Sequence, residues 1–397
     1  MITERTRFFI RLGIFIAVTC LIAFGLWYLM FNNIPSIIET PEEEIPTETG
    51  TLPGSETTEG HATEPTDTPD EETPGTLPEG QVVPAQLTSS EIISPTLTGS
   101  DTIAFYNPTD GLFYTIDKAG NIVKLSSDIF PKASTVVFNE NADAAVVEFP
   151  DGTNVVYDFI TQSQTTLPAH WREFTFSSDG ENLVAKSIGS VSGNDQLVIT
   201  STDGSQAESI GALGNNEAKI TTTWSPNNQI VAFSATGGVQ MALGRQEIYL
   251  IDTNGEVADS LVVDGSNFEA IWAPSGKAIL YSVANSSDDY RPVLWYSLSD
   301  GSKRAALDLP TWAEKCTFQN EVTAYCAVPR SAPIQSGNDH RLITAYDDVY
   351  VLNLSTGLGR LFTSPITNVQ MFNLSVSSDG SILYFSDQYG RLNSIPL

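Results

Sequence analysis

The chain has 397 residues, of which 48 are Asp or Glu and 19 are Lys or Arg, so its formal net charge at neutral pH is -29. A chain this acidic lacks the cationic surface that DNA or RNA binding requires, and we expect no nucleic-acid partner. The length is compatible with two or three ordinary domains, or with one large repeat domain and additional segments.

An apolar segment spans residues 12–31 and follows a short N-terminal segment, residues 1–11, that carries Arg5, Arg7 and Arg11. Its roughly 20 uncharged residues are enough to cross ~30 Å of hydrocarbon as a helix. Arginines precede this segment and acidic residues follow it, which predicts a single-pass anchor in the cell membrane. The N-terminus is then cytoplasmic and the C-terminal domain extracytoplasmic. The alternatives are a cleaved signal peptide, for which the apolar run is long, and a lipoprotein at Cys20, which lies inside that run.

Residues 32–83 are rich in Pro, Thr and Glu and contain no Lys or Arg. Such a segment buries too little apolar surface to offset its ordering entropy, which predicts a disordered linker. Proline and like charges extend a chain of this kind, so the linker is expected to hold the next domain away from the membrane. A binding tail is the alternative interpretation.

A repeated phrase begins at about residue 84 and continues to residue 397. It consists of an aromatic residue, a Ser-Pro-Asp-Gly turn or a variant of it, and a short run of β-branched and aromatic residues. Because the turn residues accept tight-turn backbone angles and the flanks favour strands, each copy predicts a strand, a turn and a strand. The clearest copies are residues 176–185, 224–233, 272–281 and 376–385, and weaker copies occur at 138–147, at 318–326 and near Leu97.

A second phrase follows each copy and consists of an alternating strand that ends in a polar turn with Gly, as in residues 247–255 and 348–357. One further short strand completes a four-stranded unit. The units recur every 38 to 58 residues, a period typical of propeller blades. We therefore predict an all-β fold, a closed β-propeller of about seven four-stranded blades over residues 84–397. The last unit stops after its third strand, and residues 86–93 are expected to supply the missing outer strand and close the ring.

These repeats resemble the TolB-type, WD40-like (PD40-type) propeller repeats, although the Trp-Asp pair of WD40 blades is absent. The resemblance covers most of residues 97–397. It implies binding of a protein or another component of the cell envelope. Because propellers host many functions, the fold alone does not decide between binding and catalysis.

No catalytic motif is found in the sequence, and no cofactor or metal is predicted. The histidines are His61, His170 and His340, and none has metal-ligand spacing. A carboxylate pair assembled in the central channel is the remaining route to an enzyme, such as a glycan-processing hydrolase. We interpret Trp224 and Trp272 as aromatic anchors of blade packing.

The connections between the second and third strands of the predicted blades are long, and in a four-stranded antiparallel blade they all lie on one face of the ring. Long irregular loops are often functional. The longest runs from Pro329 to Asp347 and carries the candidate binding residues Arg330, His340, Arg341 and Tyr346. We therefore expect a membrane-anchored, extracytoplasmic binding or scaffold module whose partner is an envelope protein or a glycan. The rival hypothesis is a glycan-processing or other hydrolytic enzyme that uses the channel.

Cys316 and Cys326 flank a predicted hairpin centred near Glu321. Such a hairpin places the two residues opposite each other, with Cα atoms ~4.5 Å apart, within bridging range. Disulfides persist outside the cytoplasm. The sequence therefore predicts a disulfide, with two buried free thiols as the alternative.

Overall fold

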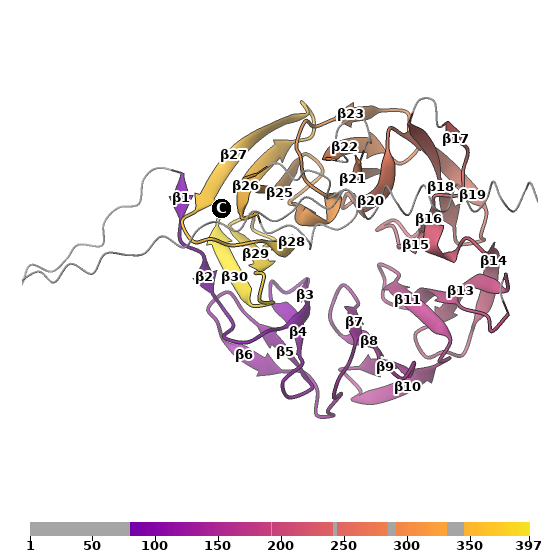
Figure 1. Ribbon diagram of the computed structural model, residues 1–397. Helices are drawn as coiled ribbons and strands as arrows, with labels where there is room; N and C mark the ends of the chain where they lie inside the picture. Colours follow the sequence, from indigo (N-terminus) through magenta and orange to yellow (C-terminus); the bar gives the residue numbers. More distant parts are fainter. Residues whose placement is uncertain (1–79, 192, 241–243, 285–290, 332–344) are drawn as a thin grey trace, which may run out of the picture. The chain divides into compact units, whose positions relative to one another are not determined.

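The computed structural model describes residues 80–191, 193–240, 244–284, 291–331 and 345–397. These residues belong to one compact unit, and their strands form seven sheets arranged as a ring about a central axis (Figure 1). The seven-bladed propeller expected from the repeats is therefore confirmed. The predicted anchor, residues 12–31, and most of the predicted linker lie outside the described residues. Within the described part of the chain, no helix has the length and apolar character needed to cross a membrane.

The first three blades follow the predicted repeat closely, and in each the strands run outward from the channel in chain order; we call these strands A to D. Blade one contains β3 (Ile93–Leu97), β4 (Ile103–Asn107), β5 (Leu112–Ile116) and β6 (Ile122–Lys124). Blade two contains β7 (Thr135–Phe138), β8 (Ala144–Glu148), β9 (Asn154–Asp158) and β10 (Ser163–Leu167). Blade three contains β11 (Trp171–Phe176), β12 (Asn182–Ser187), β13 (Asp195–Ser201) and β14 (Glu208–Gly214).

Blade four has an additional two-residue strand in its long loop, and 3₁₀ turns lie in the links that precede blades four and six. Blade four contains β15 (Ile220–Thr222), β16 (Ile230–Ser234), β17 (Val239–Gln240), β18 (Arg245–Asp252) and β19 (Val257–Val263), after the turn η1 (Glu217–Lys219). Blade five contains β20 (Ser266–Trp272), β21 (Ala278–Ala284), β22 (Pro292–Leu298) and β23 (Arg304–Ala306). Blade six follows the turn η4 (Ala313–Lys315) and contains β24 (Cys316–Phe318), β25 (Thr323–Pro329), β26 (Asp347–Asn353) and β27 (Leu358–Pro365).

Blade seven contains β28 (Phe372–Val376), β29 (Ile382–Ser386) and β30 (Leu392–Pro396), and its outer strand comes from the N-terminal side of the domain. That strand is β2 (Ala85–Gln86), which pairs antiparallel with β30. The ring is therefore closed by the N-terminal segment, as expected, but by Ala85 and Gln86 rather than by the whole of residues 86–93. The remainder of that range crosses to blade one, and Ile93 already begins its inner strand.

A second N-terminal strand was not predicted. β1 (Gln81–Val82) pairs in parallel with β27 and adds a fifth strand to blade six. The amides of Ser364 and Ile366 donate hydrogen bonds to the carbonyls of Gly80 and Val82 at 2.9 and 3.0 Å. Residues 81 and 82, which the sequence assigned to the linker, are thus paired with the propeller.

The repeated Ser-x-Asp-Gly phrase forms the A–B turn of a blade. In blade three, the Ser177 hydroxyl accepts a hydrogen bond from the amide of Asn182 at 2.9 Å and donates one to Asp179 at 2.5 Å. Gly180 follows with φ +75°, a conformation that glycine adopts without strain. In blade four Asn228 occupies this position with φ 58°, which is consistent with the tolerance of Asn for left-handed angles. In blades three and four, the turn chemistry read from the sequence is therefore the chemistry that ends the inner strand.

Side chains near the A–B turns also bind the preceding blade. Asn228 accepts a hydrogen bond from the amide of Ser178 at 3.0 Å, which joins blade four to blade three. A carboxylate oxygen of Glu321 accepts one from the amide of Ser275 at 2.6 Å, which joins blade six to blade five. These side chains satisfy turn amides that the blade itself leaves unpaired.

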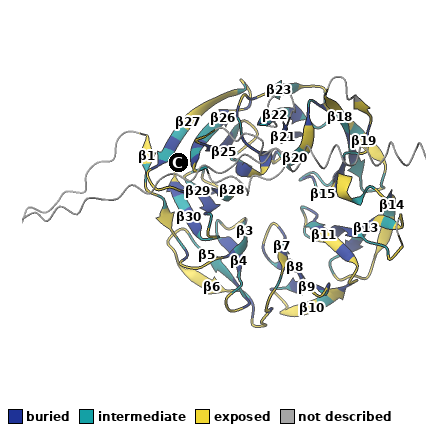
Figure 2. Cartoon of the chain, viewed as in Figure 1, coloured by how far each residue is buried: buried dark blue, intermediate teal, exposed yellow. Residues whose placement is uncertain are grey.

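The hydrophobic core lies between neighbouring blades (Figure 2). Between blades one and two, the rings of Phe113 and Phe138 meet edge to face with centroids 5.6 Å apart. The ring of Trp272 stacks on Phe233 at 5.2 Å, and its indole nitrogen donates to the Thr223 hydroxyl at 2.9 Å. Trp224 packs against the core between blades three and four. Both tryptophans thus occupy the blade-packing positions expected of them.

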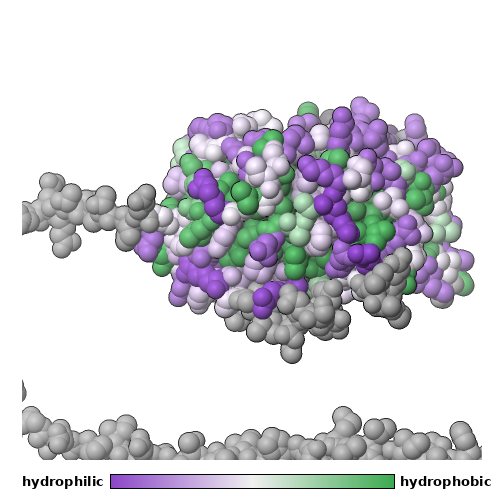
Figure 3. Space-filling model, turned by 90° about the horizontal axis from the view of Figure 1, so that it is seen from above, coloured by the Kyte–Doolittle hydropathy of each residue, from purple (hydrophilic) through white to green (hydrophobic). Residues whose placement is uncertain are grey.

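The rim of the ring is formed by the outer strands. Seen from the edge, its surface mixes hydrophobic with hydrophilic residues (Figure 3). Exposed apolar side chains of this rim include Leu358 and Leu361 of β27. Scattered apolar residues are ordinary on a protein surface, and we assign no function to the rim.

Candidate functional site

The B–C loops and the links from strand D to the next strand A lie on one side of the ring, which we call the long-loop face. The A–B and C–D turns lie on the opposite side, the short-turn face. A cavity of 480 Å³ opens on the long-loop face where blades six, seven and one meet; we call it the channel-mouth cavity. It is lined by Ile92, Glu314 and Gln370 of the D–A links, by Phe372 and Asn373 of β28, and by Ser386, Asp387, Gln388 and Gly390 at the B–C loop of blade seven.

Two further cavities lie elsewhere on the propeller. One of 400 Å³ lies beside the segment that joins β2 to β3, and one of 410 Å³ lies between blades three and four next to Trp224. The channel-mouth cavity differs from them because it includes inner-strand residues and links from three blades. Sites of this kind, concave and with convergent polar groups, are the usual location of ligand binding.

The B–C loop of blade seven is held by the carboxylate of Asp387. One oxygen accepts hydrogen bonds from the amides of Tyr389 and Arg391 at 2.8 and 2.9 Å, and the other pairs with the Arg391 guanidinium at 2.7 Å. That guanidinium lies over the Tyr389 ring, 4.9 Å from its centroid. Gly390 has φ +71°, and a Cβ there would lie 2.7 Å from Glu91, so this position requires glycine. The loop is therefore a rigid wall of the cavity.

The amide side chains in the wall are also fixed. The side-chain oxygen of Gln388 accepts a hydrogen bond from the amide of Gln370 at 3.1 Å. The Gln370 side chain in turn donates to the carbonyl of Ala345 at 3.3 Å. These bonds orient two amides before any ligand arrives, which lowers the entropic cost of binding.

The inner strands of four blades have a bulge at the end that meets the long-loop face. In each, one non-glycine residue has a left-handed φ between 50° and 56°: Ser94, Glu173, Asn267 and Asn373. Bulges redirect side chains, and strained backbone of this type is concentrated at functional sites. In blade seven the bulge places Asn373 in the wall of the channel-mouth cavity.

Ser386 is the last residue of β29 and lines the same cavity. The residue is 3% exposed, and its hydroxyl oxygen is buried without a hydrogen-bond partner among the described residues. A buried hydroxyl without a partner costs free energy, about 1–3 kcal/mol. The wall of the cavity therefore contains a polar group that a bound molecule can satisfy.

A buried ion pair supports the cavity from below. The Lys315 ammonium lies 2.7 Å from a carboxylate oxygen of Asp347, and the same oxygen accepts the amide of Met371 at 2.7 Å. Lys315 also lies over the ring of Phe372, 5.2 Å from its centroid. Burial lowers the pKa of Lys315 and raises the pKa of Asp347, while each charge favours the ionised form of the other. The pair fixes the start of β28, from which Phe372 and Asn373 extend.

A second group of charges lies on the long-loop face in blades two and three. Lys186 is buried, with 2% of the residue exposed, and its ammonium pairs with the Glu173 carboxylate at 2.7 Å. In blade two, burial raises the pKa of Glu148, Arg172 opposes this change, and Glu173 adds to it. Desolvation therefore makes the Glu148 carboxyl harder to ionise than an exposed glutamate.

Two of the four candidate residues in the longest loop are described. The Arg330 guanidinium pairs with Asp348 at 2.8 Å and donates to the carbonyl of Pro365 at 2.6 Å. Tyr346 is 38% exposed, and its carbonyl accepts the amide of Arg330 at 2.8 Å. Arg330 therefore fastens the base of the loop, while His340 and Arg341 lie outside the described residues.

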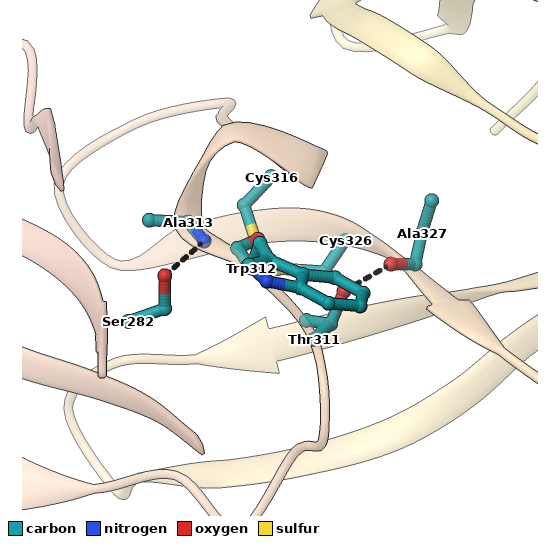
Figure 4. Close-up of a disulfide and its surroundings, with 7 residues drawn as sticks. All are labelled: Ser282, Thr311, Trp312, Ala313, Cys316, Cys326 and Ala327. Carbon is teal, nitrogen blue, oxygen red and sulfur yellow. Dashed lines mark hydrogen bonds between the residues drawn. A yellow bond between two sulfur atoms is a disulfide. The ribbon is translucent and has the colours of Figure 1, made fainter. Parts of the chain in front are cut away.

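Cys316 and Cys326 lie opposite each other on β24 and β25 and are joined by a disulfide (Figure 4). Both are buried, in the core shared by blades five and six. Nearby, the Thr311 hydroxyl donates to the carbonyl of Ala327 at 2.6 Å, and the amide of Ala313 donates to the Ser282 hydroxyl at 3.1 Å. The disulfide thus lies beneath the link that carries Glu314 to the cavity.

Among the described residues, no three His, Cys, Asp or Glu side chains converge in the way that a metal ion requires. His170 lies exposed beside Trp171, with ring centroids 6.5 Å apart. The sequence did not indicate the channel-mouth cavity, because its residues come from segments that are far apart in the chain. The sequence feature that could have indicated this cavity is the last B–C loop, Asp387-Gln-Tyr-Gly-Arg. It combines an aromatic residue, an amide and an acidic–basic pair in a short turn.

Comparison with known proteins shows the fold. No family model matches the chain, and no curated protein matches it. The structure is similar to oligogalacturonate lyase in complex with manganese, with a TM-score of 0.56, 14% identity, and coverage of 79% of this chain and 92% of that one. It is similar to the Cps50 (Swd1) β-propeller domain of Myceliophteria thermophila, with a TM-score of 0.53, 10% identity, and coverage of 79% and 100%. It is also similar to streptogramin B lyase, with a TM-score of 0.51, 10% identity, and coverage of 78% and 95%. At these identities the likeness places the domain in the β-propeller class and goes no further.

Proposed function

We propose that this chain is a membrane-anchored, extracytoplasmic binding or scaffold module whose propeller holds a protein or glycan of the cell envelope at its long-loop face. In this proposal residues 12–31 form the anchor and the acidic segment before residue 80 is the spacer. The observation that carries the proposal is the channel-mouth cavity, whose polar wall is already ordered by its own hydrogen bonds. A preorganised polar cavity favours binding.

The test is photo-crosslinking in cells that express the full chain. A benzoyl-phenylalanine is placed at Tyr389, an exposed ring on the B–C loop beside the cavity, or at Ile160, which is 76% exposed in a C–D turn on the short-turn face. We expect adducts with envelope material from position 389 and none from position 160. Adducts from position 160 alone, or equal yields from both, would contradict the proposal.

A glycan-processing enzyme is the second candidate, and one observation favours it: the buried carboxyl of Glu148, whose pKa is raised by desolvation. A general acid needs such a group. The discriminating experiment is mass spectrometry of oligosaccharides incubated with the purified full chain and with Glu148→Gln. If the wild-type chain cleaves an oligosaccharide and Glu148→Gln does not, the protein is an enzyme. If the oligosaccharides stay intact, the binding role is favoured.

A further inference from the structure

The structure points to the chemical class of ligand that the channel-mouth cavity takes, and we propose that it is an uncharged oligosaccharide. This inference rests on the proposed binding function and adds to it the ligand class, the residues that contact it and the role of each. Three features of the cavity carry the inference: its charge balance, its hydrogen-bonding groups and its aromatic rings.

Two ion pairs neutralise part of the charge around the cavity. Asp387 is paired with Arg391 at 2.7 Å, and beneath the cavity Lys315 is paired with Asp347 at the same distance. Glu314 is the other charged residue of the lining, and among the described residues no Lys or Arg belongs to that lining. In the sequence, residues 80–397 contain 34 acidic and 16 basic residues. An anionic ligand would therefore meet no cation among the described lining residues, and the acidic domain would repel it at longer range.

The hydrogen-bonding groups match hydroxyls. Amides of Gln370, Asn373 and Gln388 can both donate and accept, and carboxylate oxygens of Glu314 and Asp387 accept. Sugar hydroxyls have the same dual character, so adjacent hydroxyls can pair with an amide and a carboxylate together. The Ser386 hydroxyl is buried, lines the cavity and has no partner among the described residues. A ligand hydroxyl that reaches it relieves a cost that the free protein bears.

The aromatic rings supply apolar contact beside these polar groups. Phe372 lines the cavity, and Tyr389 is 65% exposed on the loop between the lining residues Gln388 and Gly390. The guanidinium of Arg391 stacks on one side of the Tyr389 ring and helps to hold it. A pyranose ring has apolar C–H faces and polar edges, and it therefore suits a site that combines exposed rings with amides and carboxylates.

The test measures binding of the full chain in a non-glycosidic detergent. A glycan array selects uncharged oligosaccharides, and calorimetry then compares the best of them with tetragalacturonate and with tetralysine. We expect an uncharged oligosaccharide to bind, with no binding of tetragalacturonate. Ser386→Ala should weaken that binding about three- to tenfold, the value of one hydrogen bond. Thermal stability should not fall, because the hydroxyl has no hydrogen-bond partner among the described residues.

The matched control is Ser234→Ala. Ser234 ends the corresponding strand of blade four, is also 3% exposed, and bonds to the Thr236 hydroxyl at 2.8 Å, far from the cavity in the fold. This variant should leave affinity unchanged. Asn373→Gly removes the amide while accommodating the left-handed φ of 50°, and it should weaken binding as Ser386→Ala does.

Three results would overturn the inference. The first is that no uncharged glycan binds. The second is that an uncharged glycan binds but Ser386→Ala and Asn373→Gly leave its affinity unchanged, because the binding site is then elsewhere. Tetralysine binding that these variants weaken would show that the cavity takes a cationic ligand, so that the ligand class fails while the proposed binding function stands. Failure of the proposed function itself is recognised separately, by the crosslinking yield at position 389.

Discussion

The carboxylate of Asp101 accepts hydrogen bonds from the backbone amide of Ser378 at 2.7 Å and from the Ser378 hydroxyl at 2.6 Å, across 277 residues of sequence. Asp101 lies in the A–B turn of blade one and Ser378 in that of blade seven. The same inter-blade contact recurs between Ser178 and Asn228. Because the first and last repeats are joined by it, this contact closes the ring on the short-turn face, while β2 closes it at the outer edge.

Removal of this contact should destabilise the closed ring. Asp101 has φ 60°, so Asp101→Gly removes the acceptor without imposing backbone strain. We expect a loss of about 1 kcal/mol in the free energy of unfolding, the lower part of the range for such bonds, because the site is exposed. Chemical denaturation measures it. Asp101→Asn retains an acceptor and tolerates the angle, so it should stay near the wild type; equal stability of all three proteins would show that the contact contributes nothing.

The two N-terminal strands should contribute unequally to stability. A chain that begins at residue 80 keeps β1 and β2, one that begins at residue 84 keeps β2 alone, and one that begins at residue 88 keeps neither. We expect the first to unfold like the full chain, and the second to lose about 1–2 kcal/mol, the value of two backbone hydrogen bonds. The third should be far less stable, because β30 becomes an unpaired edge. Thermal unfolding of the three proteins decides this, and a stable third protein would contradict the closure described above.

The disulfide should be present in the protein isolated from cells without a reducing agent. Of the three cysteines, Cys20 alone should react with an alkylating reagent before reduction, and all three should react afterwards. The double variant Cys316→Ala and Cys326→Ala should lose roughly 2–3 kcal/mol, from the entropy of closing a ten-residue loop. Peptide mass spectrometry provides the first measurement and denaturation the second. Three reactive thiols without reduction would refute the pairing.

Stability should fall on acidification between about pH 4 and pH 2. Hydrogen bonds in the turns lower the pKa values of Asp117, Asp179, Asp203, Asp300 and Asp379. For Asp203, bonds from Ser201 and Ser205 lower the pKa to about 2. A carboxylate whose pKa is lower in the folded state stabilises the fold above its unfolded pKa of 3.8, and the contribution is lost as pH falls through the folded pKa.

The variant Asp203→Asn isolates one of these groups. Its side chain keeps a turn acceptor but does not ionise. The difference in thermal midpoint between wild type and variant should therefore shrink as pH is lowered from 4 to 2. Parallel midpoints over this range would show that the Asp203 bonds do not depend on charge.

The sequence predicted the repeats because the chemistry of each blade is local. A Ser-x-Asp-Gly turn and its two flanking strands are specified within about ten residues, as Ser177, Asp179 and Gly180 illustrate. The ring closure was predicted only approximately. Residues 81–86 have no strong strand pattern, and their pairing with β27 and β30 depends on the edges that those strands present.

The channel-mouth cavity was not predicted, because loop length favoured the loop from Pro329 to Asp347 as the binding site. Its wall is a short loop, Asp387 to Arg391, together with Asn373 at a bulge and Glu314 in a link about 60 residues earlier. A bulge such as that at Asn373 has no sequence signature, because it results from the register between β28 and β29. Arg330, which the sequence predicted to bind a partner, instead pairs with Asp348 at the base of the longest loop.

The most direct test of the account is cysteine labelling with a membrane-impermeant maleimide in intact cells. Glu91→Cys places a thiol on the rim of the channel-mouth cavity, next to Gly390, and Ile160→Cys places one on the short-turn face. The chain without either substitution gives the background. We predict that both thiols are labelled without permeabilising the cells, and that position 91 reacts more slowly in cells than in the purified protein while position 160 does not. Labelling that requires permeabilisation would contradict the extracytoplasmic location, and unchanged labelling at position 91 would contradict a ligand at the channel mouth.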